Sequence, residues 1–213
     1  MSHDLCTPLT SILGYIQMIK KGNLPKEKHI EYIDIAERRA KDLQSLLSDF
    51  FELSIIESSD YYIELEEINI NNILCEVIAS FYSSLVDKNI TPKIDLPEEN
   101  IMIIGNEVAI KRVLQNLISN MIKHCKEDIY ISLKKENNKA VLTTINKCDD
   151  FKEEDIDSIF NRFYKKDNTR TNKNRSTGLG LFISKSLMDK MDGEIYAEVN
   201  ENLLHIFCEW NLK

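Results

Sequence analysis

The sequence predicts an α+β protein: an antiparallel helical hairpin over residues 1–60, followed by a two-layer α/β sandwich over residues 61–213. Three observations lead to this prediction. Apolar residues in the first part repeat with heptad spacing, the period changes to strand-like alternation from about Tyr61, and short strand candidates then mix with amphipathic helices. We therefore expect helices packed on one face of a mixed sheet.

The first part predicts two helices that pack along apolar seams. The seam positions of the first helix are Leu5, Leu9, Ile12, Ile16 and Ile19, and a second series with the same spacing runs from Ile33 to Phe50. Gly22-Asn23 ends the first helix and Pro25 starts the second, which we expect to run to about Glu57. Two helices alone leave their seams half exposed, so the hairpin predicts a homodimer with a four-helix bundle.

Composition and charge restrict the setting. The net charge of −8 argues against a nucleic-acid binder, which would need a basic surface. Five cysteines without a CxxC pair indicate reduced thiols, and the chain has no apolar run long enough to span a membrane, so we expect it to be cytoplasmic as given. The first predicted helix is shorter than the second. We therefore expect upstream sequence in the parent protein, with membrane anchoring through that missing part.

The second part predicts a series of strands and helices. Strand candidates lie at residues 61–70, 90–96, 101–105, 129–136, 139–146, 194–199 and 203–210, and helices are expected over 71–87, from Asn106 to about Lys126, and over 178–191. Asn137-Asn138 is typical of a hairpin turn, and Asn106 of a helix cap. A polar segment from Asp149 to Ser176 separates the last helix from the strands before it.

His3 is the first candidate for chemistry. It lies outside the heptad seam and should face water, with Asp4 beside it and Thr7 one turn further along. An imidazole whose neighbouring carboxylate accepts its ring proton can attack an electrophile. The alternative interpretation is an incidental exposed histidine near a chain start.

A polar stripe marks the helix after Asn106. Its members are Arg112, Asn116, Asn120 and Lys123, opposite an apolar face. Asparagine is a poor helix former, so two of them one turn apart are a costly choice for a merely solvated face. An amide oxygen is a hard ligand for Mg²⁺, and a lysine can meet a phosphate as a point charge. The stripe therefore has a functional interpretation beside the ordinary one of a solvated surface.

The segment "STGLGLFIS" places Gly178 and Gly180 at a predicted junction between loop and helix. Glycines let a backbone approach a phosphate, and the start of a helix presents unpaired N–H groups to it. Glycines also cap and pack helices, so this pattern alone is weak. Five basic residues between Lys165 and Arg175 precede it and predict a mobile cationic lid over an anion.

Taken in order, these segments resemble the catalytic core of sensor histidine kinases, and the resemblance covers nearly the whole chain. The similar segments are "SHDLCTPLTSILGY" for the H box, "QNLISNMIKH" for the N box, "IFNRFYKKD" for the F box and "STGLGLFIS" for the second glycine box. The resemblance implies a dimerisation and histidine-phosphotransfer hairpin over 1–60, and an ATP-binding sandwich of the GHKL superfamily over 61–213.

The resemblance also implies a role for each residue. His3 would accept the γ-phosphoryl group of ATP with Asp4 as its acid/base partner, and Thr7 with Asp4 would position water when the response-regulator receiver domain is dephosphorylated. Asn120 would coordinate Mg²⁺. The residues implied to contact the nucleotide are Asn116, Asn120, Lys123, Asn146, Tyr164, Lys165, Thr177, Gly178, Leu179 and Gly180.

Two departures bear on activity. ATPases of the same superfamily carry a glutamate where this chain has Asn116, and an amide cannot accept the proton of an attacking water, which favours a kinase over an ATPase. In the first glycine box, Asn146 replaces an aspartate, while Cys148 and Asp150 replace glycines. A neutral amide binds adenine less strongly than a carboxylate, by on the order of 1 kcal/mol, so we expect weak ATP binding. The alternative is a degenerate GHKL module with a regulatory, phosphatase or dimeric binding role.

Overall fold

The computed structural model describes residues 2–22, 24–58, 60–125, 128–147, 153–165 and 177–213. The chain divides into two compact units: the described residues up to Ile55 together with Thr177 form the first, and the other described residues form the second. Among the described residues, no helix is both long enough and apolar enough to cross a membrane.

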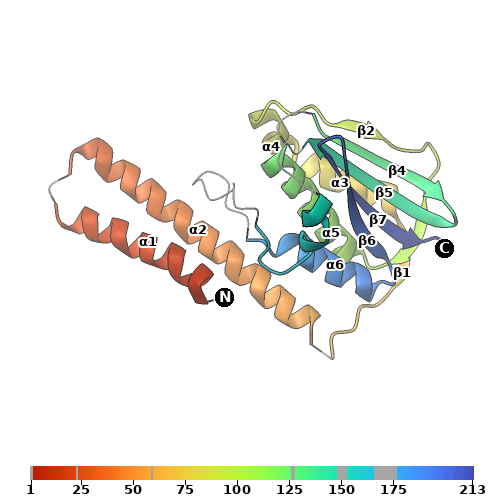
Figure 1. Ribbon diagram of the computed structural model, residues 1–213, viewed down its shortest axis with the longest axis horizontal. Helices are drawn as coiled ribbons and strands as arrows, with labels where there is room; N and C mark the ends of the chain where they lie inside the picture. Colours follow the sequence, from red (N-terminus) through yellow and green to blue (C-terminus); the bar gives the residue numbers. More distant parts are fainter. Residues whose placement is uncertain (1, 23, 59, 126–127, 148–152, 166–176) are drawn as a thin grey trace. The chain divides into compact units, whose positions relative to one another are not determined.

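The first unit contains an antiparallel helical hairpin, as predicted. Its helices are α1 (Ser2–Lys20) and α2 (Lys26–Ile56), which begins in the first unit and ends one residue into the second (Figure 1). The rings of Tyr15 and Tyr32 pack against each other across the hairpin, with centroids 5.2 Å apart. Gly22 adopts a φ of +78° after the last turn of α1, which is the left-handed conformation that glycine favours at a helix end.

The second unit is built on a five-stranded mixed sheet with the strand order β2-β4-β5-β7-β6. These strands are β2 (Lys93–Asp95), β4 (Tyr130–Glu136), β5 (Lys139–Lys147), β7 (Leu203–Asn211) and β6 (Glu194–Asn200). Only β2 and β4 run parallel, and the other neighbours are antiparallel. A separate two-stranded sheet pairs β1 (Glu66–Asn69) with β3 (Met102–Gly105).

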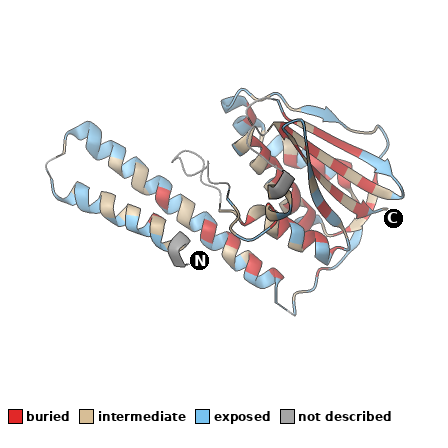
Figure 2. Cartoon of the chain, viewed as in Figure 1, coloured by how far each residue is buried: buried red, intermediate tan, exposed pale blue. Residues whose placement is uncertain are grey.

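Three helices cover one face of the five-stranded sheet (Figure 1): α3 (Ile70–Ser80), α5 (Glu107–His124) and α6 (Gly180–Lys190). The central helix α5 contacts α3, α6 and β5. Buried residues gather between the helices and the sheet (Figure 2). On α5 they are Ala109, Ile110, Val113, Leu114, Leu117, Ile118, Met121 and Ile122. This is the apolar face predicted from the sequence, and its burial holds α5 in one orientation on the sheet.

Alternation along β5 decides which of its residues face the helices. Its buried positions are Ala140, Leu142, Thr144 and Asn146, and the intervening residues are half-buried on the other face. Asn146, at the end of this buried series, is therefore on the helix-covered face. The predicted two-layer arrangement of helices on a mixed sheet is confirmed.

Several boundaries differ from the prediction. The helix expected over 71–87 is broken at Phe81, whose backbone leaves the helical conformation, so that α4 (Tyr82–Asp87) follows α3 as a separate helix. The N–H of Phe81 bonds to the carbonyl of Ile78, which tightens the last turn of α3. The helix α5 ends at His124, and α6 begins at Gly180 because Gly178 has a φ of +73°.

Two further differences concern segments of weaker pattern. Alternation over 61–70 predicts a strand, but only residues 66–69 pair as one, because the partner strand β3 is four residues long. The polar segment after Asp149 contains a short 3₁₀ helix, η1 (Glu153–Ser158). Buried Ile159 and Phe160 follow it directly and anchor this segment to the second unit.

Candidate functional site

The residues of the predicted phosphoacceptor segment lie at the beginning of α1. His3 and Asp4 belong to this helix, but their side chains lie outside the described part of the chain; Thr7 is half-buried. Pro8 lies inside the same helix and is buried. Because proline has no N–H, the backbone carbonyl four residues earlier, that of Asp4, lacks its usual helical donor.

The polar stripe of the second unit begins with a helix cap. Asn106 has an extended backbone, and its Oδ1 accepts a hydrogen bond from the N–H of Ala109 at 3.0 Å. This cap sets the start of α5 and hence the direction in which each later residue points. Asn116 and Asn120 are both half-buried on this helix, while Lys123 is exposed.

Asn116 connects α5 to the first turn of α6. Its Nδ2 donates to the carbonyl oxygen of Gly180 at 2.9 Å and to the Oγ of Ser184 at 3.2 Å. The predicted N box and second glycine box, which lie more than sixty residues apart in sequence, are thus in direct contact. The sequence patterns predict that both segments serve one site, and this hydrogen bond brings the two segments together.

The start of α6 also contacts the predicted F box. The N–H of Phe163 donates to the carbonyl oxygen of Gly178 at 2.8 Å. A Cβ on Gly178 would lie 2.9 Å from both the carbonyl carbon of Phe163 and the carbonyl oxygen of Tyr164, so this approach requires glycine. Arg162 lies over the ring of Phe182, which adds a cation–π contact between the same two segments.

The first turn of α6 has the features of an anion-binding helix start. Its cap residue Leu179 is buried and makes no side-chain cap hydrogen bond. The N–H groups of a first turn have no intrahelical acceptors, and they carry the positive end of the helix dipole. Thr177 and Gly178, the residues just before this turn, are half-buried, as is Tyr164; Lys165 is exposed.

Two amides near these elements have no hydrogen-bond partner among the described residues. One belongs to Asn120, half-buried on α5, and the other to Asn146, which is only 5% exposed on the helix-covered face of β5. An amide that no protein group binds keeps its donor and acceptor capacity for water or for a ligand. Both amides are therefore suited to bind a ligand.

Electrostatics at the end of α5 favour an anion. Burial, together with the charges of Lys123 and Lys88, lowers the pKa of His124. The Nζ of Lys88 donates to the backbone carbonyl of Ile122 at 2.6 Å, which keeps its charge at the end of the helix. His124 is therefore neutral near pH 7, and the local positive charge comes from the two lysines.

The donor set fits Mg²⁺ only in combination with a ligand. Within the described ranges, no three His, Cys, Asp or Glu side chains come together as a metal site. Mg²⁺ is commonly held by one or two protein oxygens together with substrate phosphates, and the amide oxygen of Asn120 has no competing donor among the described residues. Asn120 therefore suits a metal that arrives with a nucleotide.

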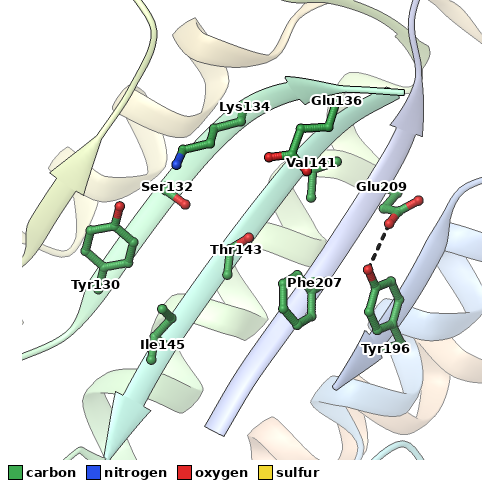
Figure 3. Close-up of a pocket in the computed structure, with 10 residues that line it drawn as sticks. All are labelled: Tyr130, Ser132, Lys134, Glu136, Val141, Thr143, Ile145, Tyr196, Phe207 and Glu209. Carbon is green, nitrogen blue, oxygen red and sulfur yellow. Dashed lines mark hydrogen bonds between the residues drawn. The ribbon is translucent and has the colours of Figure 1, made fainter. Parts of the chain in front are cut away.

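A groove on the open face of the sheet is separate from these residues. Its volume is about 300 Å³, and its lining comes from β4, β5, β7 and β6 (Figure 3). Tyr196 stacks on Phe207 with ring centroids 4.9 Å apart, and its hydroxyl donates to Glu209 at 2.9 Å. None of the predicted site residues lines this groove, since it lies on the face opposite the three helices.

The sequence patterns do not single out Ser184 and Phe163 as site residues. Ser184 is fully buried among the apolar residues Ile183, Leu187 and Met188, and a lone polar residue on an apolar helix face is the signal that could have revealed it. Phe163 has a φ of +61°, which no sequence pattern predicts. Cys148 and Asp150 of the altered first glycine box, and the predicted lid over 166–176, lie outside the described residues.

Comparison with protein families gives two matches along the chain. Residues 1–59 match the His Kinase A (phospho-acceptor) domain, and residues 105–205 match the histidine kinase-, DNA gyrase B- and HSP90-like ATPase family. The first match contains His3, and the second contains the N box, the F box and the second glycine box.

Individual proteins agree with these matches. The sensor histidine kinase YcbM of Bacillus subtilis is 33% identical over 201 residues, which are 93% of this chain and 65% of YcbM. The structure of the histidine kinase ThkA in complex with the response regulator TrrA aligns with a TM-score of 0.81 at 25% identity, covering 98% of this chain and 59% of that one. The histidine kinase AdeS of Acinetobacter baumannii shares the fold with a TM-score of 0.80 at 21% identity, over 99% and 98% of the two chains.

The chain spans 65% of the length of YcbM. It spans between 51% and 57% of the next two curated relatives, the sensor proteins VanSC and DltS. The matches favour a kinase core over a degenerate regulatory module, because kinase relatives align across both of its parts. The chain belongs to the sensor histidine kinase family, with a phospho-acceptor hairpin followed by a histidine kinase-type ATPase domain.

Proposed function

We propose that this chain is a protein histidine kinase core that uses ATP and Mg²⁺ to phosphorylate His3, and that it passes the phosphoryl group to an aspartate of a response-regulator receiver domain. The observation that carries the proposal is the contact between the three nucleotide-binding segments. Asn116 bonds to Gly180, and Gly178 accepts from Phe163, so that the N box, the second glycine box and the F box surround the start of α6.

Nucleotide binding is assigned to Asn146 and to the first turn of α6, with the residues around them. The amide of Asn146 accepts from the adenine amino group, and the N–H groups of the first turn of α6 bind phosphate oxygens, near Lys123 and Lys165. Tyr164, Thr177, Gly178, Leu179 and Gly180 line the same nucleotide. Asn120 would hold Mg²⁺, which neutralises phosphate charge when it is bound.

The proposed chemistry in the hairpin uses His3, Asp4 and Thr7. An imidazole nitrogen of His3 attacks the γ-phosphorus, a P–N bond forms as the bond to the bridging oxygen breaks, and ADP leaves. The proton on the other ring nitrogen passes to Asp4. In a separate reaction, the hydrolysis of the phosphoryl group on the receiver domain, Asp4 and Thr7 position the attacking water.

The proposal includes a homodimer and a domain division near residue 60. Large apolar side chains remain exposed on the hairpin of a single chain, and several belong to the predicted seams. They are Leu9, Leu13, Ile16, Met18, Ile30, Ile33, Leu47, Phe51 and Ile55. An apolar surface of this extent favours a partner helix pair. The complex of ThkA with TrrA supports a response regulator as the second partner. Membrane anchoring would come from other parts of the parent protein.

The direct test is phosphorylation with γ-labelled ATP and Mg²⁺. We expect a label that is labile in acid and stable in alkali, as a phosphoramidate is, and that moves to an added receiver domain. His3→Gln should abolish the label and keep the affinity for nucleotide, whereas Asn120→Ala should weaken both. A wild-type protein that binds Mg-ATP but never becomes labelled would remove the kinase proposal.

A further inference from the structure

We propose that Asn116 and Ser184 act as a positioning pair, which holds the first turn of α6 in the place where its N–H groups bind the nucleotide phosphates. The inference rests on the proposed function, because it concerns the same nucleotide. It assigns a role to Ser184, and it gives Asn116 a task other than direct contact with the ligand.

The pair forms a closed ring of three hydrogen bonds with Gly180. The Nδ2 of Asn116 donates to the carbonyl oxygen of Gly180 at 2.9 Å and to the Oγ of Ser184 at 3.2 Å. The Oγ of Ser184 in turn donates to the carbonyl oxygen of Gly180 at 3.0 Å. Both N–H groups of the Asn116 amide are therefore directed at α6, and Gly180, the first residue of that helix, is bound from two sides.

Burial separates Ser184 from the ligand. Its exposed fraction is 0%, so it can influence a nucleotide only through Asn116 and Gly180. A serine hydroxyl that bonds to the carbonyl four residues earlier is normally neutral or slightly unfavourable within a helix. In this structure the Oγ of Ser184 also accepts a hydrogen bond from Asn116 on α5, so the hydroxyl forms part of a link between two helices. This link is shielded from water, and hydrogen bonds are electrostatically stronger in such surroundings.

The cap residue of α6 does not anchor the first turn through its side chain. Leu179 makes no side-chain cap hydrogen bond, and Gly178 before it has a positive φ. The helical bond from the N–H of Ile183 to the carbonyl of Leu179, at 2.8 Å, is the first closed turn. Asn116 therefore supplies from α5 a side-chain anchor that the cap residue of α6 lacks.

Asn120 provides a contrast on the same helix. It is one turn further along α5 and equally half-buried, yet its amide bonds to none of the described residues. Of the two asparagines in the stripe, Asn116 is tied to α6, while Asn120 keeps its amide for a ligand. The sequence pattern alone does not distinguish them.

The test compares binding of the Mg²⁺ complex of AMP-PNP, which carries phosphates, with binding of adenosine, which has none. The main variant is Ser184→Ala, which removes the hydroxyl and nothing that a ligand could touch. Ser186→Ala is the matched control, because the Oγ of Ser186 makes the same type of bond within α6 itself, to the carbonyl of Phe182 at 3.1 Å. Asn116→Ala and the variant that carries both substitutions, Asn116→Ala and Ser184→Ala, complete a double-mutant cycle.

Ser184→Ala should lose about fivefold in affinity for AMP-PNP, the loss expected for the one neutral hydrogen bond that joins Ser184 to α5, and should keep its affinity for adenosine. Ser186→Ala should change neither. Because the two side chains act through one link, the double variant should lose less than the product of the two single losses. Exchange of the Ile183 N–H should be faster in Ser184→Ala than in the wild type, with no nucleotide present.

The inference is overturned if Ser184→Ala weakens adenosine and AMP-PNP equally, or changes neither. If the wild type binds no Mg-nucleotide, the proposed function fails, and the exchange measurement still decides the pair: unchanged exchange of Ile183 in Ser184→Ala would show that the pair does not hold the turn. If Asn116→Ala does not fold, Ser184→Ala alone decides the outcome.

Discussion

The backbone N–H of Phe163 donates to the carbonyl oxygen of Gly178 at 2.8 Å, and both residues have positive φ, +61° and +73°. Positive φ is rare for a bulky residue such as phenylalanine and is sustained only when its surroundings enforce it. The contact fixes the direction in which the chain enters α6. It therefore couples the F box to the helix start that we assign to phosphate binding.

This contact predicts that Gly178→Ala is harmful. An alanine would need a positive φ and would place its Cβ 2.9 Å from the backbone of Phe163, so we expect a loss of about 1–3 kcal/mol in the free energy of unfolding. Gly180→Ala is the matched control, since its Cβ would meet Asn116 at an ordinary 3.5 Å. Urea unfolding followed by the fluorescence of buried Trp210, the one tryptophan of the sequence, measures both. Equal midpoints for the two variants would contradict the prediction.

Asn146→Asp should tighten nucleotide binding about fivefold, because a carboxylate accepts a stronger hydrogen bond from the adenine amino group than an amide does. Without nucleotide the same change should lower stability, since it places a charge at a position only 5% exposed. Titration with ADP measures the affinity. Asn138→Asp, in the exposed turn between β4 and β5, controls for the added charge. Unchanged affinity would show that Asn146 is not at the adenine.

The second unit should lose stability in mild acid because of His124. Burial, with Lys123 and Lys88, holds its pKa below the usual value of 6.5, so the unfolded chain binds the proton more readily than the folded one. The free energy of unfolding should therefore fall as pH drops below about 6.5, towards the lowered pKa of the folded state. At higher pH His124 is neutral in both states, so its titration should not change the free energy of unfolding. His124→Gln should flatten the dependence when urea unfolding is repeated between neutral pH and about pH 5. Identical pH slopes in both proteins would refute this origin.

Dimerisation through the hairpin predicts that charges on the seams produce monomers. Ile16 and Ile33 are 38% and 46% exposed in the single chain, so Ile16→Glu and Ile33→Glu should leave the hairpin folded and disrupt only its association. Light scattering gives the mass and circular dichroism the helix content. Ser45→Glu, exposed and off the seam on α2, is the control and should remain dimeric. A wild-type protein with a monomer mass at micromolar concentration would argue against the four-helix bundle.

Much of the fold could be predicted because its signals are local. Heptad spacing and the Gly22 to Pro25 break are properties of neighbouring residues, and the hairpin follows from them. The apolar face of α5 likewise follows from its own repeat, and Asn106 caps that helix as its side-chain chemistry predicts. The break at Phe81 was missed because the apolar pattern continues across it, while the helix ends through a backbone turn.

The amino-acid sequence alone was enough to select the side chains that we propose for the chemistry: His3 with Asp4 on one helix, and the asparagines on another. A helical repeat places such residues on one face whatever surrounds them. The difference between Asn116, which is bound to α6, and Asn120, whose amide has no partner among the described residues, depends on the packed fold. The partner of Asn116 is 64 positions away, and a hydrogen bond at that separation exists only once α5 and α6 have packed on the same sheet.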